Sequence, residues 1–155
     1  MESMQSLITL LAHTERERDA ALAELRRRQI DERNARAQAE QLQTYRREYE
    51  QRWSGEFSRS GTSGIAIVQC YQGFVTRLGQ AIDQQLRIAQ AAAVRLAHAE
   101  TIWRECELRV AAVGKLIGRR QAQVRAVDAR REQKLLDEQA SRIAWVRRTD
   151  RLASA

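Results

Sequence analysis

The chain has 155 residues and no proline, with 5% aromatic and 30% charged residues, which is the composition of long helices rather than of a globular core. Two packed helices enclose no pocket large enough to dehydrate a small substrate, so this composition argues against an enzyme. The net charge of +7 leaves an acidic protein surface or a nucleic acid as the expected kind of partner.

The amino-terminal stretch MESMQSLITLLAHTERER has no basic start and only a short apolar run, so we do not interpret it as a secretory signal. No run of about 18 apolar residues follows, so no membrane span is predicted. With Cys106 interpreted as a core residue rather than a reactive thiol, a cytoplasmic, reducing compartment is the expected location.

A first helix is predicted over residues 3–53, a stretch without glycine or proline. Its seam, meaning the a and d positions of a heptad that face a partner helix, is interrupted at Arg18, Arg28, Glu32 and Arg46. The positions that follow the spacing are Leu7, Leu11, Thr14, Ala21, Leu25, Ala35, Ala39, Leu42, Tyr49 and Trp53. We expect a loosely packed middle in this helix.

Residues 54–64 predict a loop, because three of the seven glycines lie there among four serines. Thr62 or Ser63 could cap the next helix. A single short connection between two long helices predicts an antiparallel hairpin.

The second helix is predicted over residues 65–147, followed by a frayed C-terminus at 148–155. Its a positions run from Val68 to Val124 in steps of seven and are all apolar, and its d positions are apolar except at Gln85 and Arg120. A repeat this long favours a left-handed coiled coil. Gly73, Gly79, Gly114 and Gly118 are expected to bend or fray the helix rather than end it.

The two predicted helices are unequal in length. If position n of the first helix faces about 119 minus n on the second, the first helix reaches only to about residue 116. Residues 119–147 then have no partner within the chain, and residues 119–151 carry ten Arg or Lys against five Asp or Glu. This segment is also apolar at Val124, Val127, Leu135, Leu136, Ile143, Trp145 and Val146. Either it frays or another protein covers it, and we favour a protein.

Two stripes of side chains lie beside the seam near the predicted turn. They are Gln38, Leu42, Tyr45 and Tyr49 on the first helix and Phe74, Leu78, Ala81 and Gln85 on the second. Because the seam needs Leu42, Tyr49 and Leu78, we interpret Tyr45 and Phe74 as surplus aromatic surface, either a docking patch or a widening of the core. His13 and His98 have no companions at metal-ligand spacing, and no cofactor is expected.

At these residues the sequence resembles the flagellar export protein FliJ family, a stalk-like subunit of the type III export ATPase apparatus. The resemblance rests on Gln38-x3-Leu42-x2-Tyr45-x2-Glu48-Tyr49, the Gly/Ser loop, Tyr71-Gln72-x-Phe74-x3-Leu78-x2-Ala81-Ile82, Trp103-Arg104-Glu105, and Arg130-x2-Gln133-Lys134-x2-Asp137-Glu138-x-Ala140-x-Arg142. It covers most of the chain.

The resemblance implies a non-enzymatic coiled-coil stalk whose free helix ends enter the hexameric export ATPase ring of the FliI type. It also implies contact with the export gate protein FlhA at the inner membrane, and with export chaperones. Carried over to this sequence, the gate patch is Gln38, Leu42, Tyr45, Tyr49, Phe74, Leu78, Ala81 and Gln85, where Gln85 stands in place of a histidine found in some relatives. The ring contact is expected at Arg119, Arg120, Arg125, Arg130, Arg131 and Lys134.

Three other functions remain open from the sequence. An equivalent stalk of a virulence type III secretion system would have the same pattern, and so would an unrelated dimeric coiled-coil scaffold. A nucleic-acid binder acting through its arginines is the least favoured, because no groove-reading motif is present.

Overall fold

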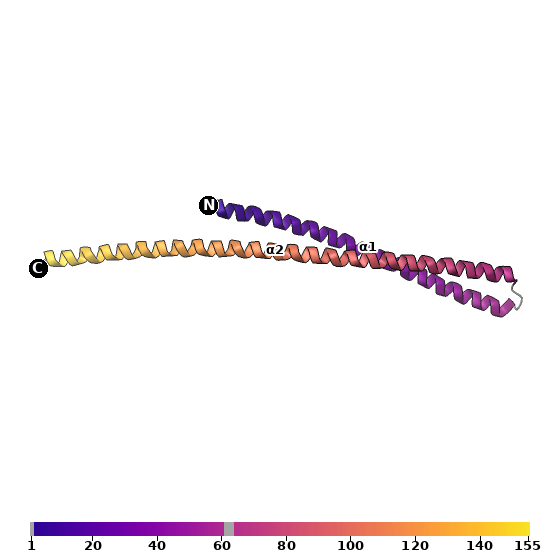
Figure 1. The fold of residues 1–155 in the computed structure, drawn as a ribbon. Coiled ribbons are helices and arrows are strands. Elements are labelled where there is room, and N and C mark those ends of the chain that lie inside the picture. The colour runs from indigo at the N-terminus through magenta and orange to yellow at the C-terminus, as the bar shows by residue number, and fades with distance from the viewer. Residues whose placement is uncertain (1, 61–63) are drawn as a thin grey trace. The chain divides into compact units, whose positions relative to one another are not determined.

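The computed structural model describes residues 2–60 and 64–155, which form two helices (Figure 1). Helix α1 spans Glu2–Ser60 and helix α2 spans Ile65–Ala153. Their lengths of 59 and 89 residues confirm the unequal pair expected from the sequence. The predicted all-α, antiparallel two-helix hairpin with a longer C-terminal helix is confirmed.

Both helices extend further than predicted. Helix α1 continues through Ser54 and Gly55 to Ser60, so the expected loop at 54–64 is wrong over its first seven residues. The hydroxyls of Ser54 and Ser58 donate hydrogen bonds to the carbonyl oxygens of Gln51 and Ser54, which keeps these serines compatible with a helix. At the other end α2 continues to Ala153, so residues 148–153 are helical rather than frayed.

The start of α2 is defined by a backbone carbonyl. The carbonyl oxygen of Gly64 accepts hydrogen bonds from the amides of Ile67 and Val68, at 3.0 and 3.3 Å. Gly64 therefore occupies the position just before the first helical residue. The capping role expected for Thr62 or Ser63 lies outside the described residues.

The chain divides into two units, and each is described separately. Unit 2, residues 16–107, contains the turn-proximal parts of both helices. Its buried apolar core consists of Leu25, Ala35, Ala39, Leu78, Ile82, Ala92, Ala99 and Cys106. All eight are predicted a or d positions, so the heptad pattern locates the buried stripe of both helices correctly.

Pairs of residues across unit 2 show that the helices run antiparallel. Residue numbers in contact across the hairpin add up to between 119 and 125, for example Tyr45 with Phe74 and Arg18 with Glu107. The predicted value of about 119 lies at the lower edge of this range. The shift follows from the longer α1, which moves the turn toward the C-terminus.

The polar interruptions of the α1 seam find partners nearby. Arg18 lies 3.7 Å from Glu107 of α2, and Arg28 donates to Glu24 at 2.8 Å within α1. Glu32 pairs with Arg36. The side chains of Arg18 and Arg28 are 29% and 33% exposed, so part of each stays in water beside the seam, whereas that of Glu32 is only 12% exposed.

Unit 1 comprises residues 1–15 and 108–155. In its described part, Thr14 and Val113 are buried, and Leu7, Leu11, Val110 and Ile117 are half-buried. Beyond Ile117 the pattern changes abruptly, because every residue from 118 to 148 is exposed. We call residues 118–153 of α2 the overhang.

Candidate functional site

An aromatic cluster lies beside the turn in unit 2. It consists of Tyr45, Tyr49 and Trp53 from α1 and Tyr71 and Phe74 from α2. Tyr49 is at its centre, with ring centroids of Phe74, Tyr71, Trp53 and Tyr45 at 4.4, 5.7, 6.0 and 6.3 Å. These distances are in the range of favourable aromatic pairs.

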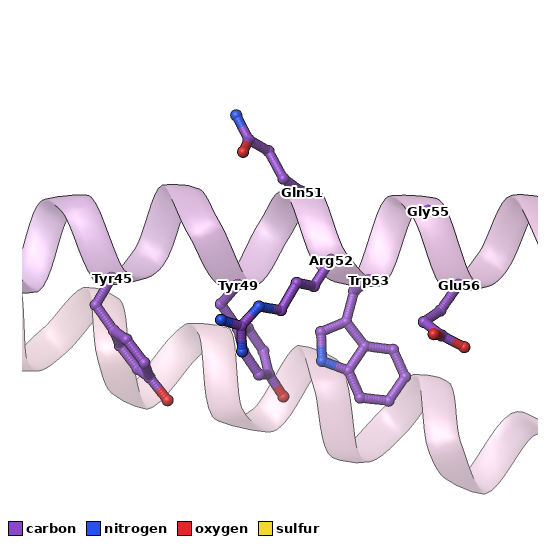
Figure 2. Close-up of a pocket in the computed structure, with 7 residues that line it drawn as sticks. All are labelled: Tyr45, Tyr49, Gln51, Arg52, Trp53, Gly55 and Glu56. Carbon is purple, nitrogen blue, oxygen red and sulfur yellow. The ribbon is translucent and has the colours of Figure 1, made fainter.

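Spacing along α1 explains the position of its three members. Tyr45, Tyr49 and Trp53 are four residues apart, so they lie on one side of the helix, and Figure 2 shows them projecting from the same side. With Gln51, Arg52, Gly55 and Glu56 they line an open groove of about 510 Å³ (Figure 2). Arg52 adds a positive charge to the lining of this groove.

The residues of the gate patch differ in accessibility. Leu78 is 8% exposed and belongs to the core, whereas Tyr45 is 48% exposed. Gln38 and Ala81 are also exposed. The remaining four, Leu42, Tyr49, Phe74 and Gln85, are half-buried. Tyr45 is therefore the main aromatic side chain that the patch presents to solvent.

The rings of Phe74 and Tyr45 contact each other. Their ring centroids are 6.4 Å apart with planes at 77°, an edge-to-face arrangement. Because Phe74 also lies against Tyr49, it widens the buried seam, while Tyr45 forms its exposed edge. Phe74 therefore fits the widening of the core, and the interpretation of Tyr45 as part of a docking patch stays a prediction.

At the end of the gate patch away from the turn, two glutamines contact each other. Nε2 of Gln85 donates to Oε1 of Gln38 at 3.1 Å and to the carbonyl oxygen of Ala35 at 3.3 Å. Gln38, Leu42, Tyr45 and Gln85 line a groove of about 380 Å³ together with Gln41. The predicted stripes therefore lie side by side, as expected.

Trp53 and Tyr71 belong to the cluster but were not included in the predicted patch. Both stand at predicted seam positions, and their ring centroids are 5.4 Å apart. A pairing sum of 119 sets Trp53 opposite residue 66, five positions from Tyr71. The seam pattern was the signal that could have placed Trp53 and Tyr71 together. The predicted turn lay too close to the N-terminus and paired each of them with other residues.

The overhang is a second exposed surface. All six residues expected to contact the ATPase ring, Arg119, Arg120, Arg125, Arg130, Arg131 and Lys134, are exposed. The large apolar side chains Val124, Val127, Leu135, Leu136, Ile143, Trp145 and Val146 are exposed as well. A monomeric soluble protein rarely leaves so many apolar side chains on one segment without a binding role.

Comparison with known families identifies the chain through most of its length. The family described as Flagellar FliJ protein matches residues 4–149. The chain belongs to the FliJ family. Comparison with curated proteins and with solved structures found no match.

Membership makes this FliJ-family chain a component of flagellar-type export, in a family whose members are non-catalytic. The match covers both candidate surfaces, the aromatic cluster in unit 2 and the overhang up to residue 149. It also favours the flagellar alternative over the virulence system and the unrelated scaffold.

Two further observations concern the described part of this FliJ-family chain. Across residues 2–60 and 64–155, no group of three or more metal-binding side chains comes together. Neither described helix has a stretch apolar enough to cross a membrane.

Proposed function

We propose that this chain is a coupling stalk that binds the export ATPase ring through the overhang and the export gate protein FlhA through the gate patch. The observation that carries the proposal is the exposure of every residue from 118 to 148 on a helix that is both basic and apolar. The same stalk would bind export chaperones and work in the cytoplasm, at the inner-membrane export apparatus.

Length and charge support the ring as the partner of the overhang. The 36 residues from 118 to 153 make about 54 Å of helix, enough to enter a protein ring deeply. Ten basic residues against five acidic ones between 119 and 151 favour an acidic or polar opening. Charge would guide docking, and the apolar side chains would supply most of the affinity.

The exposed edge of the aromatic cluster supports the gate contact. Tyrosine is frequent among residues that dominate binding energy, and Tyr45 stands between two grooves that it helps to line. Gln38 and Ala81, also exposed, extend this surface along both helices. A partner loop or helix end could therefore insert an apolar side chain beside Tyr45.

The ring contact is tested by binding of the purified export ATPase to a variant with Arg119, Arg125 and Arg130 changed to Gln. We expect binding to weaken at least about tenfold and to depend less on salt. A matched control changes Arg26, Arg33 and Arg47, which are exposed on α1. Equal binding by both variants would remove the overhang from the ring contact.

The gate contact is tested with Tyr45→Ala and binding of the FlhA cytoplasmic region. Because Tyr45 is 48% exposed, its removal should leave the fold intact and weaken binding at least about tenfold. Val94→Ala, an exposed apolar residue elsewhere on α2 in unit 2, is the control. Unchanged binding of Tyr45→Ala would overturn this assignment.

A further inference from the structure

The overhang carries a repeat that differs from the seam. Starting from the buried seam residue Val113, the overhang residues Val124, Leu135 and Val146 follow at intervals of 11, and Arg120, Arg131 and Arg142 recur at the same interval between them. Three turns of helix take about 10.8 residues, so both series lie on one side of α2. The heptad pattern therefore gives way to an 11-residue pattern, which favours a slight right-handed supercoil over a left-handed one.

This stripe is complementary to itself when reversed. If two overhangs run antiparallel with Leu135 facing Leu135 of a second copy, residue n faces about 270 minus n. Val124 then meets Val146 of the second copy. Asp128 meets its Arg142, and Arg131 meets its Gln139 with Glu138 beside it.

The Leu135 layer lies on the two-fold axis and occurs once, and every other layer occurs twice because the arrangement is symmetric. The result is an apolar centre at Leu135, opposite charges on both sides of it, and apolar layers further out. In the single chain Asp128 is 3.9 Å from Arg131 on an exposed surface, and such a pair contributes little. Desolvation between two copies would strengthen the pairing of opposite charges.

The parallel alternative is disfavoured by the same residues. Parallel overhangs in register would place Arg131 against Arg131 and Arg142 against Arg142, and Asp128 against Asp128. Like charges that face each other in a packed seam repel, which selects against this orientation. The charges therefore favour the antiparallel orientation and the register in which Leu135 faces Leu135.

We propose that two copies of this chain pair antiparallel through their overhangs, with Leu135 on the two-fold axis. Each overhang covers the part of the other that α1 is too short to cover. Residues 120–150 give about 46 Å of paired helix. The pairing does not depend on the proposed function, but it covers the same apolar side chains, so a second copy and the ATPase ring compete for the overhang.

Sedimentation equilibrium of the full chain tests the pairing directly. We expect the mass to rise with concentration from 17.8 kDa to twice that value. Arg142→Asp should weaken self-association at least about tenfold, because two repulsive pairs form with Asp128. Asp128→Arg should do the same, and the charge swap Asp128→Arg with Arg142→Asp should restore the dimer. Arg130→Asp is the matched control, since Arg130 lies about 140° away from Leu135 around the helix.

Cross-linking gives the orientation, because the chain has only the two lysines Lys115 and Lys134. A short amine cross-linker should join Lys134 to Lys134 of the second copy, which sit on the same flank next to the axis. Lys115 should not be linked to Lys115 of the second copy, since about 60 Å of helix separates the two residues. A monomer at every concentration, a Lys115 to Lys115 link, or a charge swap that fails to restore the dimer would each overturn the proposal.

Discussion

Gln85 of α2 donates its side-chain amide to Oε1 of Gln38 of α1 at 3.1 Å, across the antiparallel seam. The same amide reaches the backbone carbonyl of Ala35 at 3.3 Å. Gln85 occupies a d position among apolar neighbours, where a polar side chain fixes alignment at some cost in stability. One glutamine therefore defines which residues of the two helices face each other.

Replacing Gln85 with leucine is expected to raise the free energy of unfolding by about 1 kcal/mol, because an apolar side chain joins the seam. Gln85→Ala should lower it instead, because the hydrogen bonds are lost without new packing. Urea titration followed by circular dichroism measures both. A destabilised Gln85→Leu would show that the amide contributes stability as well as alignment.

Ile82→Ala is expected to lower the free energy of unfolding by about 2 to 3 kcal/mol. Ile82 is 4% exposed, so the change leaves a cavity between the helices. Val94→Ala, at a position that is 60% exposed, should change it by less than about 0.5 kcal/mol. Thermal unfolding of the two variants makes the comparison, and equal effects would contradict the assigned seam.

Substitutions at Tyr49 and Tyr45 should have different effects, because Tyr49 is expected to contribute mainly to stability and Tyr45 mainly to binding. Tyr49 contacts four other rings, and Tyr49→Ala is expected to cost about 2 to 3 kcal/mol. Tyr45→Ala should cost less than about 1 kcal/mol, because half of that side chain is already in water. If chemical denaturation gives both variants the same loss, the cluster is not centred on Tyr49.

Gly114→Ala is expected to stabilise α2 by about 1 kcal/mol. A methyl group added at Gly114 would meet nothing within 4 Å, so the gain in helix propensity carries no steric cost. Gly118→Ala is equivalent and sits at the start of the overhang. Higher helix content and a later unfolding transition are the readouts, and a loss of stability would reveal a close contact at these glycines.

The sequence predicted the buried stripe well because a packed seam needs apolar residues at regular spacing, and Ile82, Ala92, Ala99 and Val113 meet that need. It predicted the turn less well. Glycine and serine are poor helix formers, but their penalties, about 1 kcal/mol for glycine and less for serine, are offset by the packing of Trp53 against Tyr71 just before them.

The membership of the aromatic cluster depended on that turn. Shifting the pairing by a few positions exchanges the residues that face each other, so Tyr71 was recognised only as a seam residue. The overhang, by contrast, required only the two helix lengths, which are insensitive to small errors at the ends. Charges on Arg125 or Lys134 show that a partner could be acidic, but they carry no information about which partner it is.

The three tryptophans occupy three different environments, and this gives the chain its own optical reporters. Trp53 is half-buried among the rings beside the turn, and Trp103 is half-buried in the seam, with its Nε1 enclosed and without a hydrogen-bond partner among the described residues. Trp145 is 67% exposed on the overhang. After Trp53→Phe and Trp103→Phe, a blue shift of the remaining indole emission would report burial of the overhang alone, whatever covers it.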